Sequence, residues 1–435
     1  MQSDGLMRIY IESFGCSTNM ADGEVLAGCL REAGYMFTDS MSEANIVIYN
    51  CCSVKGPTEN RMIDLLQRVP PSKKLIVAGC LPLTSHERLL HSVRFDGVLG
   101  PAAGRQIIDV VKRVLAGEHV VALEDASRSK PLLGLPRLRK SYVISLVPVG
   151  YGCLGACAYC CVVFARGRIR SYTIDEITEK VENDVSSGAQ EFWLTAQDMA
   201  CYGNDLGTNL ADLLKAVCAV PGDFKVRVGM MTPNLALEIL PELIKSFKDA
   251  KVFKFLHLPV QSGDNDVLRN MNRCYTVEEF TKVVTAFRGA FPDVTLATDV
   301  ICGFPGETRQ SFENTLGLLR KVKPDIVNVS KFFARPGTAA AALKEGLVAQ
   351  AEIKRRSAET AGLAKNLSLE RNKRWVGKDG TILIDEKGKL PCTWIGRNVA
   401  YKPVTLKSCL NLLGRSIQIK ITEAFSTYLS GTITE

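Results

Sequence analysis

The stretch Cys153-Leu-Gly-Ala-Cys157-Ala-Tyr-Cys160 brings three cysteines together at the spacing C-x-x-x-C-x-x-C. Iron-sulfur clusters are held by cysteine thiolates, and a four-iron cluster usually has four of them. A site that supplies only three leaves one iron open to a different ligand. The spacing therefore predicts an iron-sulfur site whose open iron binds a substrate or a cofactor.

A zinc site and a disulfide framework are the two alternatives for such a loop. Structural zinc sites have four ligands, typically in two paired clips, but the four histidines of the chain are scattered and none pairs with these cysteines. Disulfide frameworks belong to small secreted domains. Fifteen cysteines in 435 residues is a low density, and no secretory signal precedes the first strand-like run. Reduced thiols in the cytoplasm are therefore expected.

The composition is that of a globular protein with two or three domains. The chain is 46% hydrophobic and 23% charged, and single cores stop growing near about 250 residues. No segment approaches the roughly 20 consecutive apolar residues of a membrane span, so no membrane partner is expected. The net charge is +8, and residues 371–435 hold eleven Lys and Arg against five Asp and Glu. This terminal excess favours a polyanion such as RNA, with a solvated basic surface as the alternative.

Residues 1–123 alternate strand-like and helix-like segments, which predicts a doubly wound parallel sheet. The expected strands are 8–12, 45–50, 75–79 and 97–100, and the expected helices are 22–33, 57–68, 85–93 and 105–115. Cys16, Cys52 and Cys80 follow the first three strands. Because ligands of such sheets gather beyond the carboxyl ends of the strands, these residues predict a second three-thiolate site.

Cysteines are also good small core residues, which is the alternative for this second trio. All three, however, lie in turns that contain or adjoin Gly, Asn, Ser or Pro. The middle turn reads Asn50-Cys51-Cys52, so either thiol could be the ligand, and the register of the strand favours Cys52.

Residues 124–141 are expected to be a polar, proline-containing linker, and residues 142–371 a second α/β series. Strand-like runs at 145–148, 191–194, 225–230, 253–258, 294–300 and 325–332 are each followed by a helical pattern. Six such units predict an incomplete (β/α)6 barrel with its chemistry at the carboxyl face, where the cysteine loop follows the first strand. Residues 372–435 carry short alternating runs between polar turns, which predicts a small β-barrel.

Further motifs stand at the later strand ends of the central series. They are Phe164-Ala-Arg166-Gly167, Gln197-Asp198, His257-Leu-Pro-Val-Gln261-Ser262-Gly263, Thr298-Asp299-Val-Ile-Cys-Gly303-Phe304-Pro305-Gly306-Glu307-Thr308 and Ala334-Arg335-Pro336-Gly337-Thr338. Together with both cysteine triads, they make the chain resemble the radical S-adenosylmethionine (SAM) methylthiotransferases over about residues 8–430. The sequence around Cys153 and Cys157 is most similar to that of the archaeal and eukaryotic branch, which acts on threonylcarbamoyladenosine in tRNA. Residues 372–435 resemble TRAM, the RNA-binding barrel that ends these enzymes.

The resemblance implies two [4Fe-4S] clusters and SAM as cofactors. The catalytic cluster on Cys153, Cys157 and Cys160 would cleave SAM to a 5'-deoxyadenosyl radical, which abstracts hydrogen from the substrate. The auxiliary cluster, on the triad at the sheet edge, would carry a sulfur atom that a second SAM methylates. The implied product is a methylthioether.

Five residues are candidates for binding SAM or orienting the substrate by their position: Tyr159, Gln197, Asp198, Gln261 and Asp299. Each of them could instead be a structural cap. Arg166 and Arg335 are expected to meet a SAM carboxylate or an RNA phosphate, because the guanidinium fork suits both. The remaining cysteines, Cys161 and Cys201 among them, are interpreted as structural.

The implied reaction is methylthiolation of carbon 2 of N6-threonylcarbamoyladenosine at position 37 of tRNA. Its partners would be the anticodon stem-loop and two further proteins or small molecules that donate electrons and sulfur. Within the family, N6-isopentenyladenosine in tRNA and a ribosomal-protein aspartate are the alternative substrates. A non-catalytic iron-sulfur protein that binds RNA and senses redox state is the alternative from another class. The basic terminal segment favours RNA.

Overall fold

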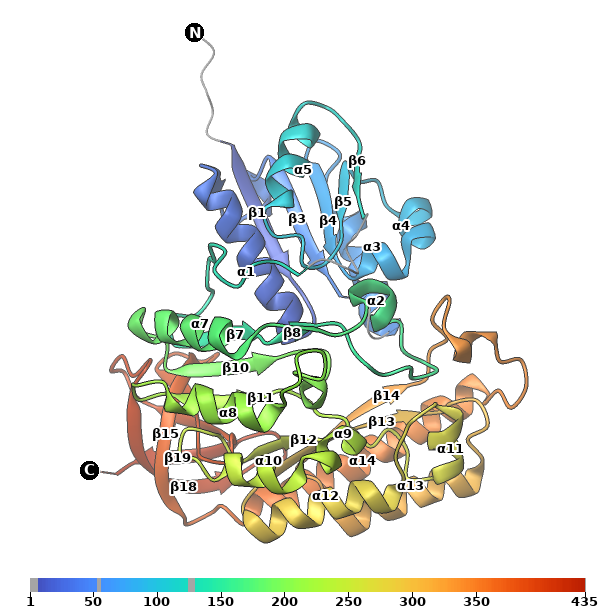
Figure 1. Ribbon diagram of the computed structural model, residues 1–435, viewed down its shortest axis with the longest axis vertical. Coiled ribbons are helices and arrows are strands. Elements are labelled where there is room, and N and C mark those ends of the chain that lie inside the picture. Colours follow the sequence, from blue (N-terminus) through green and yellow to red (C-terminus); the bar gives the residue numbers. More distant parts are fainter. Residues whose placement is uncertain (1–6, 53–55, 124–129, 435) are drawn as a thin grey trace.

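The computed structural model describes residues 7–52, 56–123 and 130–434. It contains a six-stranded parallel sheet, two three-stranded parallel sheets and a closed five-stranded barrel, in that order along the chain. Figure 1 shows the first sheet at the top in blue, the central strands beneath it in green to orange, and the terminal barrel at the lower left in red.

The first sheet has the strand order β2-β1-β3-β4-β5-β6, with every neighbouring pair parallel. Its strands are β1 (Arg8–Ser13), β2 (Met36–Phe37), β3 (Ile46–Cys51), β4 (Lys74–Gly79), β5 (Gly97–Leu99) and β6 (Val120–Ala122). Its helices are α1 (Ser17–Glu32), α2 (Gly56–Gln67), α3 (Leu81–Thr84), α4 (His86–Ser92) and α5 (Gln106–Leu115), with a 3-10 turn η1 (Met41–Glu43). The predicted doubly wound sheet is confirmed.

Two separate apolar clusters cover the two faces of this sheet. One gathers Ile46 and Ile48 with α1 and α5, and the other gathers Val47 and Tyr49 with α2 and α4. Every residue of β3 is buried. A strand covered on both faces is apolar on both sides, which explains why it appeared in the sequence as one continuous hydrophobic run.

The segment after β6 lies along α1. Residues 124–129 of the predicted linker are outside the described residues. Beyond them, Arg137 forms an ion pair with Glu24 of α1 at 2.6 Å, and both side chains are buried. The backbone N–H of Leu138 donates to the carbonyl of Glu24 at 2.9 Å. The linker therefore ties the first unit to the second.

The central unit is an open barrel of six principal strands in two sheets, β11-β10-β7 and β12-β13-β14. They are β7 (Ile144–Pro148), β10 (Glu191–Thr195), β11 (Lys225–Val228), β12 (Phe255–His257), β13 (Thr295–Cys302) and β14 (Ile326–Lys331), with a small pair β8 (Gly150–Tyr151) and β9 (Arg170–Ser171). A single bridge between Val226 and Val252 connects the two sheets. Within the described part of the chain β7 and β14 do not pair, so the predicted partial barrel is confirmed.

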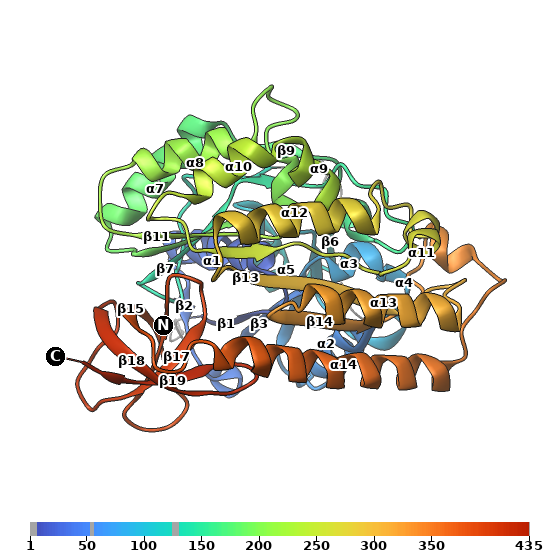
Figure 2. The ribbon, with the colours of Figure 1, turned by 90° about the horizontal axis from the view of Figure 1, so that it is seen from below.

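Helices cover the outside of this open barrel (Figure 2). They are α6 (Val162–Arg166), α7 (Ile174–Ser186), α8 (Leu210–Ala219), α9 (Pro233–Glu238), α10 (Leu240–Phe247), α11 (Asn265–Asn270), α12 (Val277–Ala290), α13 (Arg309–Val322) and α14 (Gln350–Lys373), with the 3-10 turns η2 (Met199–Cys201) and η3 (Ala339–Ala342). Capping boxes begin α7 at Thr173 and α12 at Thr276. Each box satisfies backbone N–H groups at a helix start, which fixes where the helix begins.

The chain ends in a closed barrel with the strand order β15-β16-β17-β19-β18. The strands are β15 (Asp379–Lys387), β16 (Thr393–Arg397), β17 (Pro403–Lys407), β18 (Ser416–Ala424) and β19 (Leu429–Ile433). Trp375, Trp394 and Leu429 belong to its core. Closure leaves the sheet without unpaired edges, and the predicted small β-barrel is confirmed.

This terminal barrel packs against the amino ends of the central strands. Tyr401 lies between Phe253 and Phe255, with ring centroids 4.9 and 5.2 Å away. The ammonium of Lys402 pairs with Asp325, just before β14, at 2.8 Å. The terminal barrel and the carboxyl face of the central unit are therefore at opposite ends of the same strands.

Candidate functional site

Three turns at the carboxyl edge of the first sheet hold the first predicted triad. Cys16 precedes α1, Cys80 precedes α3, and Cys52 follows β3. Cys51 and Gly79 are register partners in adjacent parallel strands, so the next residues, Cys52 and Cys80, leave the sheet side by side. The structure thus brings the three predicted cysteines to one edge.

Glycine at position 15 permits the close approach of the first and second turns. Gly15 has φ +105, and a Cβ there would stand 2.6 Å from Sγ of Cys52 and closer still to its Cβ. The turns are also bonded to each other, because Asn19 donates to the carbonyl of Asn50 at 3.1 Å and Asn50 donates to the carbonyl of Asn19 at 2.6 Å. A side chain at position 15 would force the thiols apart.

The second triad lies in the loop between β8 and α6. The N–H of Gly155 donates to Sγ of Cys153 at 3.2 Å, and the N–H of Val162 approaches Sγ of Cys160 at 3.5 Å. Nη1 of Arg273 donates to Sγ of Cys157 at 2.9 Å. Such donors stabilise the thiolate form.

The chemistry of both triads can be compared with that of an iron-sulfur site. Within the described ranges, no group of three or more His, Cys, Asp or Glu side chains is arranged to hold one metal ion. The donor set at each triad is sulfur from cysteine, with N–H groups directed at the sulfurs, which is the chemistry that iron-sulfur clusters require. The residues present therefore fit the group.

Cys201, interpreted from the sequence as structural, lies beside the second triad. A hydrogen bond from its thiol is the main cause that lowers the pKa of Cys153, while the same contact raises the pKa of Cys201. Its Sγ also stands 3.0 Å from the carbonyl of Asp198. No spacing signal in the sequence links positions 153 and 201, which are 48 residues apart.

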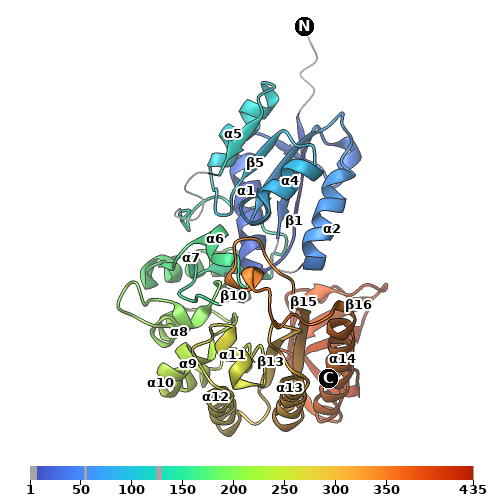
Figure 3. The ribbon, with the colours of Figure 1, turned by 90° about the vertical axis from the view of Figure 1, so that its right-hand side faces the viewer.

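The segments that carry the two triads meet at the interface of the first and central units. The hydroxyl of Thr195, at the carboxyl end of β10, lies 2.7 Å from Ser17 Oγ and 3.1 Å from Thr18 Oγ1, in the first turn of α1. Figure 3 shows α6 beside the lower end of α1. The carboxyl edge of the sheet therefore lies on the carboxyl face of the open barrel.

Arg166 spans this interface. Its Nε donates to Sγ of Cys80 at 3.3 Å, and its Nη2 donates to Asn19 at 3.1 Å and to Asp22 at 2.7 Å. Its side chain is 1% exposed, and its Nε and Nη2 are bound within the protein. The expected contact with a SAM carboxylate or an RNA phosphate stays a prediction.

Arg335 makes the second buried bridge between the units. It donates to Glu59 of α2, and Glu59 also accepts from Arg88 of α4 at 2.8 Å. The side chains of Arg335 and Glu59 are each 4% exposed. Its Nη2 has no hydrogen-bond partner among the described residues, so one donor stays available for a ligand at this interface.

Two of the five candidate SAM-binding side chains accept hydrogen bonds from backbone N–H groups. Oε1 of Gln197 accepts from the N–H of Gly152 at 2.7 Å, directly before Cys153. Asp198 caps η2 by accepting from Ala200 and also accepts from Thr232, both at 3.0 Å. These contacts position the cysteine loop and the neighbouring turn.

The other three candidates line the carboxyl face of the open barrel. Tyr159 packs edge-on against Phe304 at 6.4 Å, which provides the aromatic wall. Gln261 has φ +68 and forms a bridge with Val300. A carboxylate oxygen of Asp299 lies 3.1 Å from Nε2 of His257.

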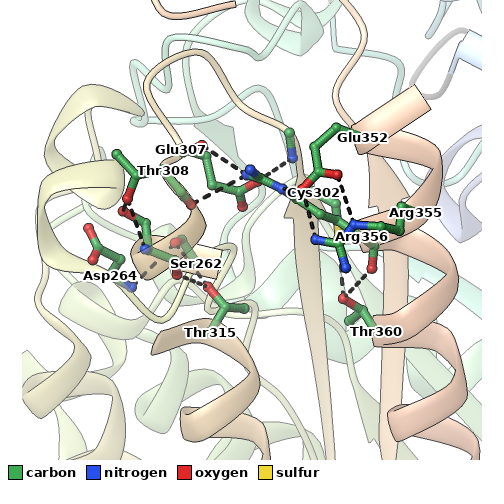
Figure 4. A network of polar contacts seen from close by, with 12 residues as sticks. Ser262, Asp264, Cys302, Glu307, Thr308, Thr315, Glu352, Arg355, Arg356 and Thr360 are labelled. Carbon is green, nitrogen blue, oxygen red and sulfur yellow. Dashed lines mark hydrogen bonds and ion pairs between the residues drawn. The ribbon is translucent and has the colours of Figure 1, made fainter. Parts of the chain in front are cut away.

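The loop after β13 is held by α14 (Figure 4). Glu307 accepts from the N–H of Gly303 and from Nη1 of Arg356, both at 2.7 Å. Burial raises the pKa of Glu307, although Arg356 opposes that effect. A Cβ on Gly303, whose φ is +80, would collide with Ile353 of α14. This motif is therefore a clamp that fixes the rim of the barrel.

Not every basic group of the terminal barrel faces solvent. Arg371, Arg397 and Lys402 pair with buried Asp325 or Asp385. The exposed cations of the segment are Lys373, Arg374, Lys378, Lys387, Lys389, Lys407, Arg415 and Lys420. They leave a basic outer surface.

Three aromatic side chains of the terminal segment differ in exposure. Trp394 and Tyr401 are buried, and the indole N–H of Trp394 donates to the carbonyl of Ser408 at 3.0 Å. Phe425 is exposed and stacks on Tyr428 with ring centroids 4.5 Å apart.

Comparison with known proteins agrees with this geometry. Residues 147–319 match the Radical SAM superfamily, and residues 8–100 match the uncharacterized protein family UPF0004. A probable threonylcarbamoyladenosine tRNA methylthiotransferase of Pyrococcus abyssi is 42% identical, with 98% of this chain and 100% of that protein covered. The chain belongs to the threonylcarbamoyladenosine tRNA methylthiotransferase family. The Homo sapiens member is 33% identical over 98% of this chain and 74% of its own length.

Solved structures of other proteins share the fold of this family member. The radical S-adenosylmethionine methyltransferase TsrM of Kitasatospora setae, with cobalamin and a [4Fe-4S] cluster bound, superposes with a TM-score of 0.56 at 11% identity over 77% of each chain. The cobalamin-dependent radical enzyme OxsB gives 0.52 at 13% identity, over 83% of this chain and 56% of that one, in its complex with aqua-cobalamin and S-adenosylmethionine. None of the described helices is long and apolar enough to cross a membrane.

Proposed function

We propose that this chain methylthiolates carbon 2 of N6-threonylcarbamoyladenosine at position 37 of tRNA. The family relationship over 98% of the chain supports the reaction. The observation that carries the assignment is the meeting of both cysteine triads at one interface, where Arg166 connects the end of the cysteine loop with Cys80. A non-catalytic redox sensor would not need two open three-thiolate sites at one interface.

Cys153, Cys157 and Cys160 would hold the radical SAM [4Fe-4S] cluster, and the triad at the sheet edge would hold the auxiliary one. When bound, the first cluster supplies the electron for reductive cleavage of SAM. The residues around it orient the cysteine loop and compensate its charge. Gln197 orients the start of the cysteine loop, and Arg273 compensates the charge of Cys157.

Tyr159, Gln261 and Asp299 remain our candidates for contacts with SAM or with the modified base. Tyr159 and Phe304 offer an apolar wall for a flat ring. The pair of Asp299 and His257 offers hydrogen-bonding groups from adjacent strands. All lie on the carboxyl face, where (β/α) barrels carry their chemistry.

The overall conversion balances with sulfur supplied as hydrosulfide. One SAM gives its methyl group to sulfur and leaves as S-adenosylhomocysteine. A second SAM is cleaved to methionine and a 5'-deoxyadenosyl group. This group takes up the hydrogen from the substrate carbon and leaves as 5'-deoxyadenosine. A carbon–hydrogen bond breaks, a carbon–sulfur bond forms, one proton is released, and the electron used for cleavage is recovered when the new bond forms.

The domains of the chain follow from this assignment. Residues 1–123 would form the auxiliary-cluster domain, 124–141 the linker, 142–371 the radical SAM domain and 372–435 the TRAM domain. The exposed cations of the terminal barrel support binding of the tRNA anticodon stem-loop through its phosphates. We place the reaction in the cytoplasm, with an electron donor and a sulfur donor as additional partners.

The test is anaerobic incubation of reconstituted protein with dithionite, SAM, sulfide and tRNA that carries threonylcarbamoyladenosine, followed by mass spectrometry of the nucleosides. We expect the mass gain of a methylthio group together with 5'-deoxyadenosine. Cys80→Ala should abolish the methylthio product while 5'-deoxyadenosine still forms, and Cys157→Ala should abolish both. Cys51→Ala, a buried cysteine next to the triad, is the matched control and should keep both.

Two results would contradict the proposal. Formation of 5'-deoxyadenosine without modification of this tRNA would redirect the search to tRNA with isopentenyladenosine or to ribosomal protein. Absence of 5'-deoxyadenosine from protein with both clusters intact would reject the radical reaction and favour a binding protein.

A further inference from the structure

A hydrogen bond of Arg166 connects the segment next to one cysteine triad with a thiol of the other. It ends α6, which begins just after Cys160 and Cys161. Its Nε stands 3.3 Å from Sγ of Cys80. The residue therefore belongs by sequence to the catalytic loop and by contact to the auxiliary site.

The guanidinium is fully enclosed and is only partly satisfied. Nη2 is bound by Asn19 and Asp22, but Nη1 is buried without a hydrogen-bond partner among the residues that the structure describes. An unpaired N–H of a buried charged group is costly. This group is therefore available to an acceptor that is not a protein atom.

The counter-charge of Arg166 is held in a fixed position. Asp22 accepts from Arg166 at 2.7 Å and from the hydroxyl of Tyr151 at 2.6 Å. Tyr151 stands two residues before Cys153, and the carbonyl of Arg166 accepts from Arg170 at 2.9 Å. Both sides of the cysteine loop therefore anchor the Arg166–Asp22 pair.

This arrangement places a positive group against the thiol of Cys80 and a negative group against that positive group. In a buried, weakly polarisable environment, such a charge acts strongly on its neighbours. The reduction potentials of iron-sulfur clusters depend on hydrogen bonds to the sulfurs and on nearby charge. A positive charge next to the sulfurs favours the reduced, more negative form of a cluster.

We propose that Arg166 is a positioning residue that raises the reduction potential of the auxiliary cluster. Its Nε donates to the thiolate of Cys80, one of the three predicted ligands Cys16, Cys52 and Cys80. Asp22, the ion-pair partner of Arg166, attenuates the effect. The inference rests on the proposed function, because it requires a cluster at this triad.

The test isolates the auxiliary site in protein that carries Cys153→Ala, Cys157→Ala and Cys160→Ala. After anaerobic reconstitution, iron content is measured and the midpoint potential is determined by a redox titration followed by electron paramagnetic resonance. Arg166→Gln should shift the potential to a more negative value, and Asp22→Asn should shift it to a more positive value. Arg166→Lys, which keeps the charge, should lie between the parent and Arg166→Gln.

A matched control separates this role from simple support of α1. Arg137→Gln breaks the other buried arginine–carboxylate pair on the same helix, with Glu24, and contacts no predicted ligand. It should leave the potential unchanged. Shifts of the same sign in Arg166→Gln and Asp22→Asn, or an equal shift in Arg137→Gln, would overturn the inference.

Three further outcomes are also decisive. If Arg166→Gln does not take up iron, the positive shift of Asp22→Asn and the position of Arg166→Lys relative to the parent still test the sign of the effect. If the parent itself binds no cluster, the assignment of the auxiliary triad is refuted, and the inference falls with it. A cluster that is present but insensitive to Arg166 refutes the inference alone.

Discussion

Cys51 and Cys52 are adjacent in the chain, yet their thiols have different surroundings. Cys51 ends β3 and belongs to the apolar cluster with Val47 and Tyr49. Cys52 lies beyond the strand, against Gly15 of the neighbouring turn. The end of the strand explains the difference, because Cys51 is the last residue that packs within the sheet, whereas Cys52 belongs to the turn that follows it.

Replacing each of these cysteines should separate iron binding from core packing. In protein that lacks the cysteines of the catalytic loop, Cys52→Ala should lose most of the roughly four irons expected for one cluster. Cys51→Ala should keep them and lower the free energy of unfolding by about 1 kcal/mol. An iron assay and urea unfolding measure the two effects. The reverse pattern would assign the ligand role to Cys51.

Glu59 has one buried and one exposed arginine partner, and their contributions to the free energy of unfolding can be compared. Arg335→Ala should lower the free energy of unfolding by about 3 kcal/mol, because it removes a partner from a buried carboxylate. Arg88→Ala removes a partner whose side chain is 41% exposed, and the loss should stay below about 1 kcal/mol. Denaturant unfolding compares the two variants. Equal losses would mean that Arg335 does not support the interface.

The terminal barrel should bind tRNA through its exposed cations only. Lys407→Ala should weaken binding and reduce the slope of log affinity against log salt by about 1, because one phosphate contact is lost. Lys402→Ala, which removes a buried partner of Asp325, should lower stability and leave the slope unchanged. Fluorescence anisotropy at several salt concentrations gives both slopes. A changed slope for Lys402→Ala would contradict this division.

The free energy of unfolding should depend on pH through a buried carboxylate at the interface between the central unit and the terminal barrel. Burial, with repulsion from Asp385, raises the pKa of Glu191 to about 7, whereas an unfolded glutamate titrates near about 4.3. The folded state therefore binds the proton more strongly, so the free energy of unfolding should fall as pH rises from about 4.3 to about 7. Above that range the loss is complete.

Glu191→Gln should flatten this dependence, and thermal unfolding between about pH 5 and about pH 8 measures it. Asp385, whose pKa is raised to about 6 by burial, should retain a smaller dependence in the variant. The control is Glu386→Gln. It alters a half-exposed carboxylate that pairs with Arg397 of the terminal barrel. A stability of Glu191→Gln that falls as steeply as that of the parent would refute the expectation.

Features with a local signal were predictable from the sequence. The βα alternation of both α/β units, the loop position of Cys153 and the turns at Cys16, Cys52 and Cys80 depend on patterns within a few residues. Strands β2 and β6 have two and three residues, which is too short for a periodic pattern. Helix α1 begins at Ser17, five residues before the expected start, because Asn19 and Gly23 disguise its first turns.

Contacts between distant segments could not be predicted. The bond from Arg166 to Asp22 joins residues 144 positions apart, and nothing in either segment identifies the partner. The same holds for Cys201 beside Cys153. Composition likewise cannot show that Arg371, Arg397 and Lys402 face buried carboxylates, since charge counts do not distinguish internal ion pairs from a solvated surface.

Helix α14 fixes the distance between the rim of the central unit and the terminal barrel. It starts at the clamped rim beside Glu307 and ends at the terminal barrel, where Asn372 donates to the carbonyl of Phe425 at 2.7 Å. Twenty-four helical residues extend about 36 Å. An RNA gripped by the terminal barrel can present to the cysteines only a nucleotide at a matching distance from the grip. The length of one helix would then select which position along the RNA is modified, independently of the identity of the bases in between.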